Sequence, residues 1–94
     1  MNKVIILLKG SDCAPCAQFE PVFDEVAQAT GLPVVKYVDD IEMMQRFGVR
    51  QVPVVVLADE IGGRTQANHI LAGTNLRRAV LVQAIENFKS DVEE

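Results

Sequence analysis

The sequence predicts an α/β fold in which a four-stranded mixed sheet is covered by helices on both faces. Three features of the chain predict it. Short runs of β-branched and aliphatic residues recur, segments with apolar residues at helical spacing separate them, and glycine, proline or aspartate stands at the boundaries. The expected order of elements is β-α-β-α-β-β-α.

The first two expected strands flank a long helix. Residues 3–8 form a continuous aliphatic run suited to the buried middle of a sheet, and residues 34–38 form a short Val-rich run. Between them, residues 13–30 are expected as a helix that ends before Gly31 and Pro33. The apolar face of this helix consists of Phe19, Val22, Phe23, Val26 and Ala27.

The second half of the chain predicts a short helix, a hairpin and a last helix. Asp39 and Asp40 can cap a helix at residues 41–47, which ends at Gly48. Residues 54–57 and 67–72 are expected as antiparallel strands, joined by a turn at residues 59–64 that contains Gly62 and Gly63. The inner face of the last helix, capped by Thr74 or Asn75, is expected to hold Leu76, Val80, Leu81, Ala84, Ile85 and Phe88. The two helical crossovers predict right-handed parallel pairing of the strands that they connect.

Length and composition predict one globular domain over residues 1–94. Hydrophobic residues make up 49% of the chain and charged residues 23%, an ordinary globular composition. The formal net charge is −4, which argues against nucleic acid as a partner, since phosphate binding needs clustered cations. The adjacent basic pair Arg77-Arg78 is expected on a solvated helix face.

The apolar run at residues 4–8 is too short for the core of a signal peptide, and no run is long enough to span a membrane. We therefore expect no membrane association and a cytoplasmic location. In that reducing compartment, paired cysteines more often do redox work or bind metal than form permanent cross-links.

The two cysteines of the chain stand in the motif Cys13-Ala14-Pro15-Cys16, at the start of the first expected helix. Free backbone N–H groups and the helix dipole stabilise an anion there, so the pKa of Cys13 should fall below about 8.5. Cys16 lies one turn further on the same side, where it can attack a mixed disulfide formed at Cys13. The adjacent carboxylate of Asp12 opposes this effect on the pKa.

Two other interpretations stay open on these residues alone. A Cys-x-x-Cys pair can be half of a zinc site, and a dimer that shares four cysteines is its best form, because His69 is the one histidine. His69 itself is expected as a structural or exposed strand residue. Pro53 can begin a strand with an ordinary trans bond, or a cis Val52–Pro53 bond can turn the Val52 backbone outward.

The motifs carry a family resemblance over nearly the whole chain. Residues 13–27, with Pro21 five residues after Cys16, resemble the active-site helix of thioredoxins, which contains C-G-P-C. Val38-Asp39, followed by residues 46–53, which end in Val52-Pro53, is similar to the thioredoxin segment that leads to a cis-proline. Ala72-Gly73 resembles the third edge of the thioredoxin substrate groove.

The resemblance implies a thioredoxin fold and an enzyme-like dithiol carrier that reduces protein disulfides. Cys13 would be the nucleophile, Cys16 the resolving thiol, and the two would form the redox disulfide. Substrate would be bound by Ala14, Pro15, Val52, Pro53, Gly73 and Thr74. The implied partners are disulfide-containing proteins and a thioredoxin-reductase-like flavoprotein, with glutathione less favoured. The protein would act as a monomer, without cofactor or metal ion.

Three departures from thioredoxins keep other functions open. Thioredoxins usually carry an extra strand and helix before the first strand expected here, Asp12 replaces an aromatic residue, and Leu7 replaces a buried aspartate. Val35 falls near the place of that aspartate's lysine partner. The short N-terminus is like that of glutaredoxins and of small redoxins that donate electrons to ribonucleotide reductase. The alternatives are therefore a glutathione-dependent redoxin, a ribonucleotide reductase redoxin, and a non-catalytic subunit that binds a partner near Pro53.

Overall fold

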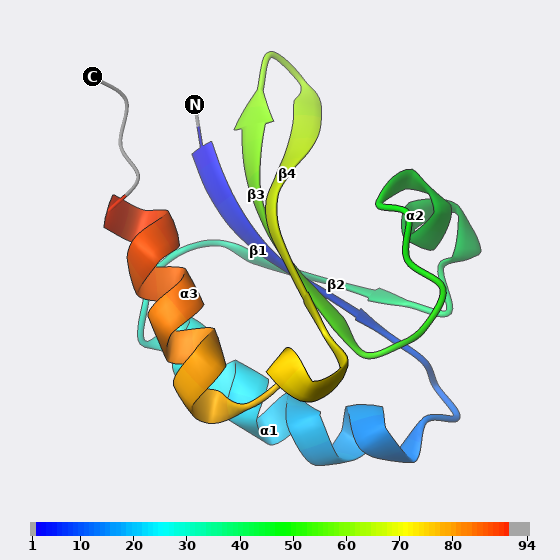
Figure 1. Ribbon diagram of the computed structural model, residues 1–94. Coiled ribbons are helices and arrows are strands. Elements are labelled where there is room, and N and C mark those ends of the chain that lie inside the picture. The colour runs from blue at the N-terminus through cyan, green and yellow to red at the C-terminus, as the bar shows by residue number, and fades with distance from the viewer. Residues whose placement is uncertain (1, 91–94) are drawn as a thin grey trace.

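The computed structural model describes residues 2–90 and has the predicted order of elements (Figure 1). One four-stranded sheet has the strand order β2-β1-β3-β4. Its elements are β1 (Asn2–Lys9), α1 (Ala14–Gln28), β2 (Val34–Val38), α2 (Ile41–Arg46), β3 (Val54–Ile61), β4 (Arg64–Ala72), the 3-10 turn η1 (Gly73–Asn75) and α3 (Arg78–Ser90). The prediction of a mixed four-stranded α/β fold is confirmed.

The direction of β3 corrects one expectation. β1 and β2 are parallel, as the first crossover predicts, but β3 is antiparallel to β1 and pairs Val54 with Leu8. The 15 residues of α1 rise about 22 Å, enough to return along an eight-residue strand of about 26 Å with its connecting loops. The six residues of α2 rise only about 9 Å, so β3 starts at the end of the sheet where β2 stops.

The hairpin of β3 and β4 is longer than expected. Its ladder continues from Val54 to Ile61, which pairs with Arg64, so the expected turn at residues 59–64 narrows to two glycines. Gly62 and Gly63 have φ of 57° and 82°, the left-handed conformation that a two-residue hairpin turn requires. The outer half of this hairpin is mostly exposed, so its sequence lacks the apolar run that marks a buried strand.

α1 and α2 each begin after a residue whose side chain caps the helix, but α3 does not begin at either of its expected caps. Cys13 caps α1, and the Asp40 carboxylate accepts a hydrogen bond from the Met43 N–H at 3.0 Å as the cap of α2. The expectation that Thr74 or Asn75 caps the last helix is wrong. Both residues lie in η1, and α3 begins only at Arg78.

Alternate side chains of the central strands enter two separate apolar cores, because successive residues of a strand point to opposite faces. Figure 1 shows α1 and α3 on one side of the sheet and α2 on the other. Ile5, Leu7, Val55 and Leu57 pack against α1 and α3, whose buried side chains include Phe19, Phe23, Leu81, Ile85 and Phe88. The opposite faces of β1 and β3 pack against Met43, Met44 and Phe47 in and after α2. Within residues 2–90, no helix combines the length and apolar character needed to cross a bilayer.

Candidate active site

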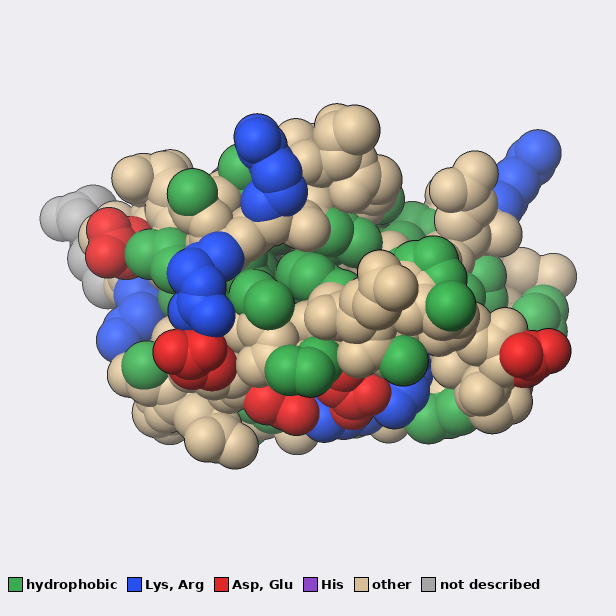
Figure 2. Space-filling view, turned by 90° about the horizontal axis from the view of Figure 1, so that it is seen from below, with side chains coloured by type: hydrophobic (Ala, Val, Ile, Leu, Met, Phe, Trp, Pro, Cys, Tyr) green, Lys and Arg blue, Asp and Glu red, His purple; other side chains and the backbone are tan. Residues whose placement is uncertain are grey.

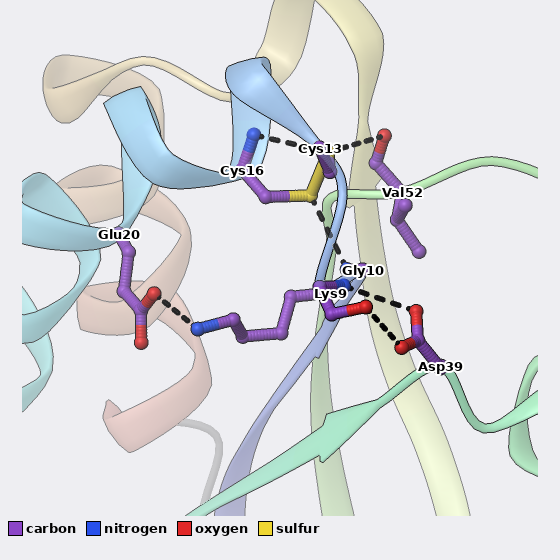
Figure 3. Close-up of a disulfide and its surroundings, with 8 residues drawn as sticks. Lys9, Gly10, Cys13, Cys16, Glu20, Asp39 and Val52 are labelled. Carbon is purple, nitrogen blue, oxygen red and sulfur yellow. Dashed lines mark hydrogen bonds and ion pairs between the residues drawn. A yellow bond between two sulfur atoms is a disulfide. The ribbon is translucent and has the colours of Figure 1, made fainter.

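Cys13 and Cys16 form a disulfide at the N-terminus of α1, with their Cα atoms 5.2 Å apart (Figure 3). The two sulfurs differ in environment. Cys13 is partly exposed, whereas Cys16 is 2% exposed and its Sγ accepts a hydrogen bond from the Gly10 N–H at 3.5 Å. An incoming molecule therefore meets Cys13 first.

The start of α1 places the Cys13 sulfur where it can accept hydrogen bonds. Cys13 has extended backbone angles, φ −145° and ψ 100°, and its Sγ accepts from the Cys16 N–H at 3.1 Å. Pro15 lies in the first turn, where its missing N–H would have had no partner within the helix. The sulfur thus takes the role of a helix-capping side chain, and the N–H groups that cap onto it also stabilise a thiolate.

The segment before β3 lies against the disulfide. The Val52–Pro53 peptide bond is cis, and the Val52 carbonyl oxygen is 3.9 Å from Cys13 Sγ. Gly10 lies between the two, since a Cβ added to it would come into van der Waals contact with Cys13 Cβ and with Val52 Cγ2, each at 3.4 Å. Residues 39 positions apart in the sequence thereby face each other across the reactive sulfur.

Asp39 holds the loop that carries Cys13. Its carboxylate accepts from the Ser11 N–H at 3.0 Å and from the Ser11 hydroxyl at 2.5 Å, and these bonds, the hydroxyl first, keep the pKa of Asp39 below its usual value. The φ of Asp39 is 53°, a left-handed conformation that aspartate tolerates better than most residues. The sequence indicates Asp39 as a candidate helix cap and as part of a thioredoxin-like segment, but Asp40 alone caps α2.

A cluster of charges joins α1 to the sheet next to the disulfide. Glu20 forms ion pairs with Lys9 of β1 and with Lys36 of β2, the latter at 2.7 Å, and Lys36 also pairs with Asp24 at 2.8 Å. The hydrogen bonds from Lys36 and then Lys9 lower the pKa of Glu20, while Asp24 and then Glu20 raise the pKa of Lys36.

The strand register also corrects the expectation that Val35 falls near the place of the lysine partner. Leu7 is paired with Lys36 across the parallel strands, not with Val35. A lysine therefore stands beside Leu7, and its carboxylate partners come from α1.

A groove of about 500 Å³ begins beside the disulfide and runs between α1, the segment before β3 and the connection from β4 to α3. Four of the residues expected to bind substrate line it, namely Pro15, Val52, Pro53 and Gly73. Two others do not: Ala14 is the first residue of α1, and Thr74 lies in η1 without contributing to the lining.

The sequence missed most of the remaining lining of this groove. Its apolar part includes Phe19, Val22 and Leu76, which the helical patterns had assigned to the core. Gln18 and Gln51 add amides, but no sequence pattern distinguished them from solvated residues.

Arg77 and Arg78 also line the groove, and Figure 2 shows hydrophobic side chains in a hollow on this face with Lys or Arg side chains at its rim. Both arginines are exposed, as expected for a solvated helix face, but only Arg78 is helical, as the first residue of α3, and Arg77 lies in the connection between η1 and α3. The Arg78 guanidinium pairs with Glu25 of α1 at 2.6 Å, which raises the pKa of Arg78 and lowers that of Glu25.

His69 lies on β4 opposite Leu57 and lines a different, shallow depression together with residues of α3. No group of three or more His, Cys, Asp or Glu side chains in the described part of the chain is arranged to hold a metal ion.

Comparison with known proteins gives a consistent result. A family model described as the thioredoxin domain matches residues 2–64. A mutant thioredoxin from Halobacterium salinarum NRC-1 is 26% identical and superposes with a TM-score of 0.75, over 98% of this chain and 79% of that one. A thioredoxin from Thermus thermophilus is 19% identical, with a TM-score of 0.73 over 95% of this chain and 75% of that one.

A thioredoxin from Trypanosoma brucei brucei is 18% identical, with a TM-score of 0.75 over 96% of this chain and 77% of that one. Among curated protein sequences, no match was found. The fold and the disulfide-forming pair together support a thiol–disulfide oxidoreductase. Since the family model covers residues 2–64 of the 94, the chain belongs to the thioredoxin domain family.

Proposed function

We propose that this protein reduces disulfide bonds in protein substrates, with Cys13 as the attacking thiol and Cys16 as the resolving thiol. The observation that carries the proposal is the asymmetry of the disulfide. Cys13 is partly exposed and caps a helix next to Pro15 and Val52 of the groove lining, whereas Cys16 is buried.

In the reduced protein, the Cys13 thiolate attacks one sulfur of the substrate disulfide. The substrate S–S bond breaks, a bond forms between Cys13 and that sulfur, and the other substrate sulfur leaves as a thiolate that takes up a proton. Cys16 then loses its proton and attacks the Cys13 sulfur. The mixed disulfide breaks, the second substrate thiol is released, and two electrons have passed to the substrate as the Cys13–Cys16 disulfide forms.

The groove supplies the binding surface in this proposal. The Val52 carbonyl oxygen lies 3.9 Å from Cys13 Sγ, and in this proposal it accepts a hydrogen bond from the backbone N–H of an extended substrate segment. Pro15, Pro53 and Gly73 border the same space and give that segment an apolar wall. A flavoprotein of the thioredoxin reductase type would return two electrons to the disulfide and complete the cycle.

The proposal is tested by reduction of a disulfide-bonded protein such as insulin. We expect the wild-type protein to catalyse its reduction by an external dithiol, and the Cys13→Ser variant to be inactive. The Cys16→Ser variant is the matched control, because it keeps the attacking thiol. It should accumulate a covalent adduct with substrate that mass spectrometry detects.

Full activity in Cys13→Ser would overturn the proposal. Binding of a partner protein that is equal in the wild type and in a variant with both cysteines replaced by serine would favour a non-catalytic subunit. Regeneration by glutathione in place of a flavoprotein reductase would favour a glutathione-dependent redoxin.

A further inference from the structure

We propose that the groove beside the disulfide selects substrate segments that carry a carboxylate side chain about three residues from the reacting cysteine. The inference rests on the proposed reduction of protein disulfides and adds the chemical class of segment that is favoured. Arg77 is the residue that makes the selection.

The first argument is the charge of the lining. Two arginines line the groove and no aspartate or glutamate does, although the whole chain has a net charge of −4. The charge of Arg78 is compensated by its ion pair with Glu25. Among residues 2–90, no carboxylate pairs with Arg77, which is exposed and available to an incoming group. The groove therefore presents one uncompensated cation above an apolar floor.

The second argument is the distance between this cation and the disulfide. The groove follows α1 from Pro15 to Val22, a rise of about 10 Å. Arg77 lines the same groove, together with Gly73 and Leu76, so it lies within this length of the disulfide end. An extended chain covers about 10 Å in three residues. A segment whose cysteine is bonded to Cys13 thus brings the side chain about three residues away towards Arg77.

The acidic groups near the groove further restrict where in the substrate segment a carboxylate is favoured. Asp12 precedes Cys13 directly, so a carboxylate immediately beside the substrate cysteine meets a like charge. At the far end of the groove, Arg78 already forms an ion pair with Glu25. The favoured position is therefore at a distance from the disulfide and not next to it, which separates this selection from a general attraction of anions.

The expected size of the effect is modest. Arg77 is exposed, and an exposed ion pair changes a rate constant by about two- to fivefold. The effect should act on kcat/KM through association and should weaken as salt screens the charges.

The test uses three peptides, each with one cysteine in a disulfide with the same neutral reporter thiol. They carry Glu, Gln or Lys three residues from that cysteine, on either side in separate sets. At low salt we expect the reduced wild-type protein to react fastest with the Glu peptide, about two- to fivefold faster than with the Lys peptide. This preference should disappear at about 1 M salt.

The variants assign the preference to one side chain. Arg77→Gln should react equally with all three peptides, and Arg77→Glu should react fastest with the Lys peptide. A gain of rate for the Lys peptide cannot come from a damaged fold. Arg64→Gln, a charge neutralisation of equal size on the distant β3–β4 hairpin, should keep the wild-type preference.

A small neutral disulfide separates the two proposals. If wild-type protein reduces it but reacts alike with all three peptides, or if Arg77→Gln keeps the preference, the selection for carboxylates is wrong and disulfide reduction stands. A preference for the Lys peptide would also overturn the selection. If neither the peptides nor the neutral disulfide is reduced, the proposed function itself fails.

Discussion

At the scale of single residues, the place of Cys13 at the start of α1 gives it two roles. As the N-cap of α1 it accepts a hydrogen bond from the Cys16 N–H, and it is the more exposed member of the pair. Asp39, which follows β2, holds the loop before Cys13. Val52, which precedes β3, faces the sulfur. The reactivity of Cys13 is therefore set by its place at the end of a helix together with contacts from distant parts of the chain.

In the reduced protein, the Cys13 thiol should be more acidic than that of a free cysteine. Because the helix N-terminus donates to its sulfur, we expect the pKa of Cys13 to lie below about 8.5. The measurement is the thiolate absorbance near 240 nm as a function of pH in the Cys16→Ser variant, which leaves one titrating cysteine. A pKa of about 8.5 or above would show that the Asp12 carboxylate outweighs the helix terminus.

At the scale of elements, α1 organises the site because each of its faces has a different task. Its first turn holds both cysteines, and its apolar face buries Phe19 and Phe23 against the sheet and α3. Its charged residues Glu20 and Asp24 bind lysines of β1 and β2. A helix held by apolar contacts and ion pairs keeps its N-terminus in place when the disulfide opens and closes.

The ion pairs of Glu20 should stabilise the protein only where Glu20 is ionised. Its pKa is below the ordinary value of 4.5 in the folded protein, mainly because Lys36 and then Lys9 donate to it. This contribution is present above the pKa of the unfolded chain and is lost as the pH falls through the folded pKa. Glu20→Gln should therefore lower the free energy of unfolding by about 0.5–1 kcal/mol at pH 7 and have little effect near pH 2.

Urea unfolding at the two pH values measures this difference. Glu86→Gln, at an exposed position of α3, is the matched control. A loss in Glu20→Gln that is equal at both pH values would contradict the assignment to ion pairs.

Phe23 connects α1 to the core and does not itself line the groove, although its ring centroid lies 6.4 Å from that of Phe19, which does. It is fully buried, so Phe23→Ala should reduce the free energy of unfolding by about 3–5 kcal/mol through lost burial and a cavity. The pKa of Cys13 should stay unchanged. Chemical denaturation provides the measurement, with exposed Gln28→Ala at the end of α1 as control. An unchanged denaturation midpoint would show that Phe23 does not support the core.

At the scale of the whole molecule, stability is distributed unevenly around the sheet. β1 and β3 occupy its centre and contribute side chains to both cores. The six-residue α2 has no buried residue, yet it leads into the segment that places Val52 against Cys13. One wall of the site is therefore connected to the least buried helix of the described chain.

Hydrogen exchange should reveal this difference. Amides in the interior of β1 and β3 should exchange only through global opening, whereas those of α2 should exchange faster, through local opening. Exchange followed residue by residue by NMR makes the comparison. Equal protection of α2 and β1 would mean that the helix opens only together with the sheet.

What could be predicted from the sequence depended on interactions between neighbours along the chain. Apolar periodicity located all three helices and four strands, and Asp40 marked the start of α2. The motif at residues 13–16 placed a cysteine pair at the start of α1. These features were predictable because a helix face, a cap or a buried strand is encoded within a few consecutive residues.

The tertiary structure decided the features that depend on distance through space. The length of α2 relative to a strand made β3 antiparallel to β1, and η1 moved the start of α3 so that Arg77 lines the groove. The contact of Val52 with Cys13 and the pairing of Lys36 beside Leu7 likewise join segments that are remote in sequence. The sequence by itself determined the elements and the thiol pair, and packing determined what surrounds the pair, because only the folded path of the chain brings distant side chains together.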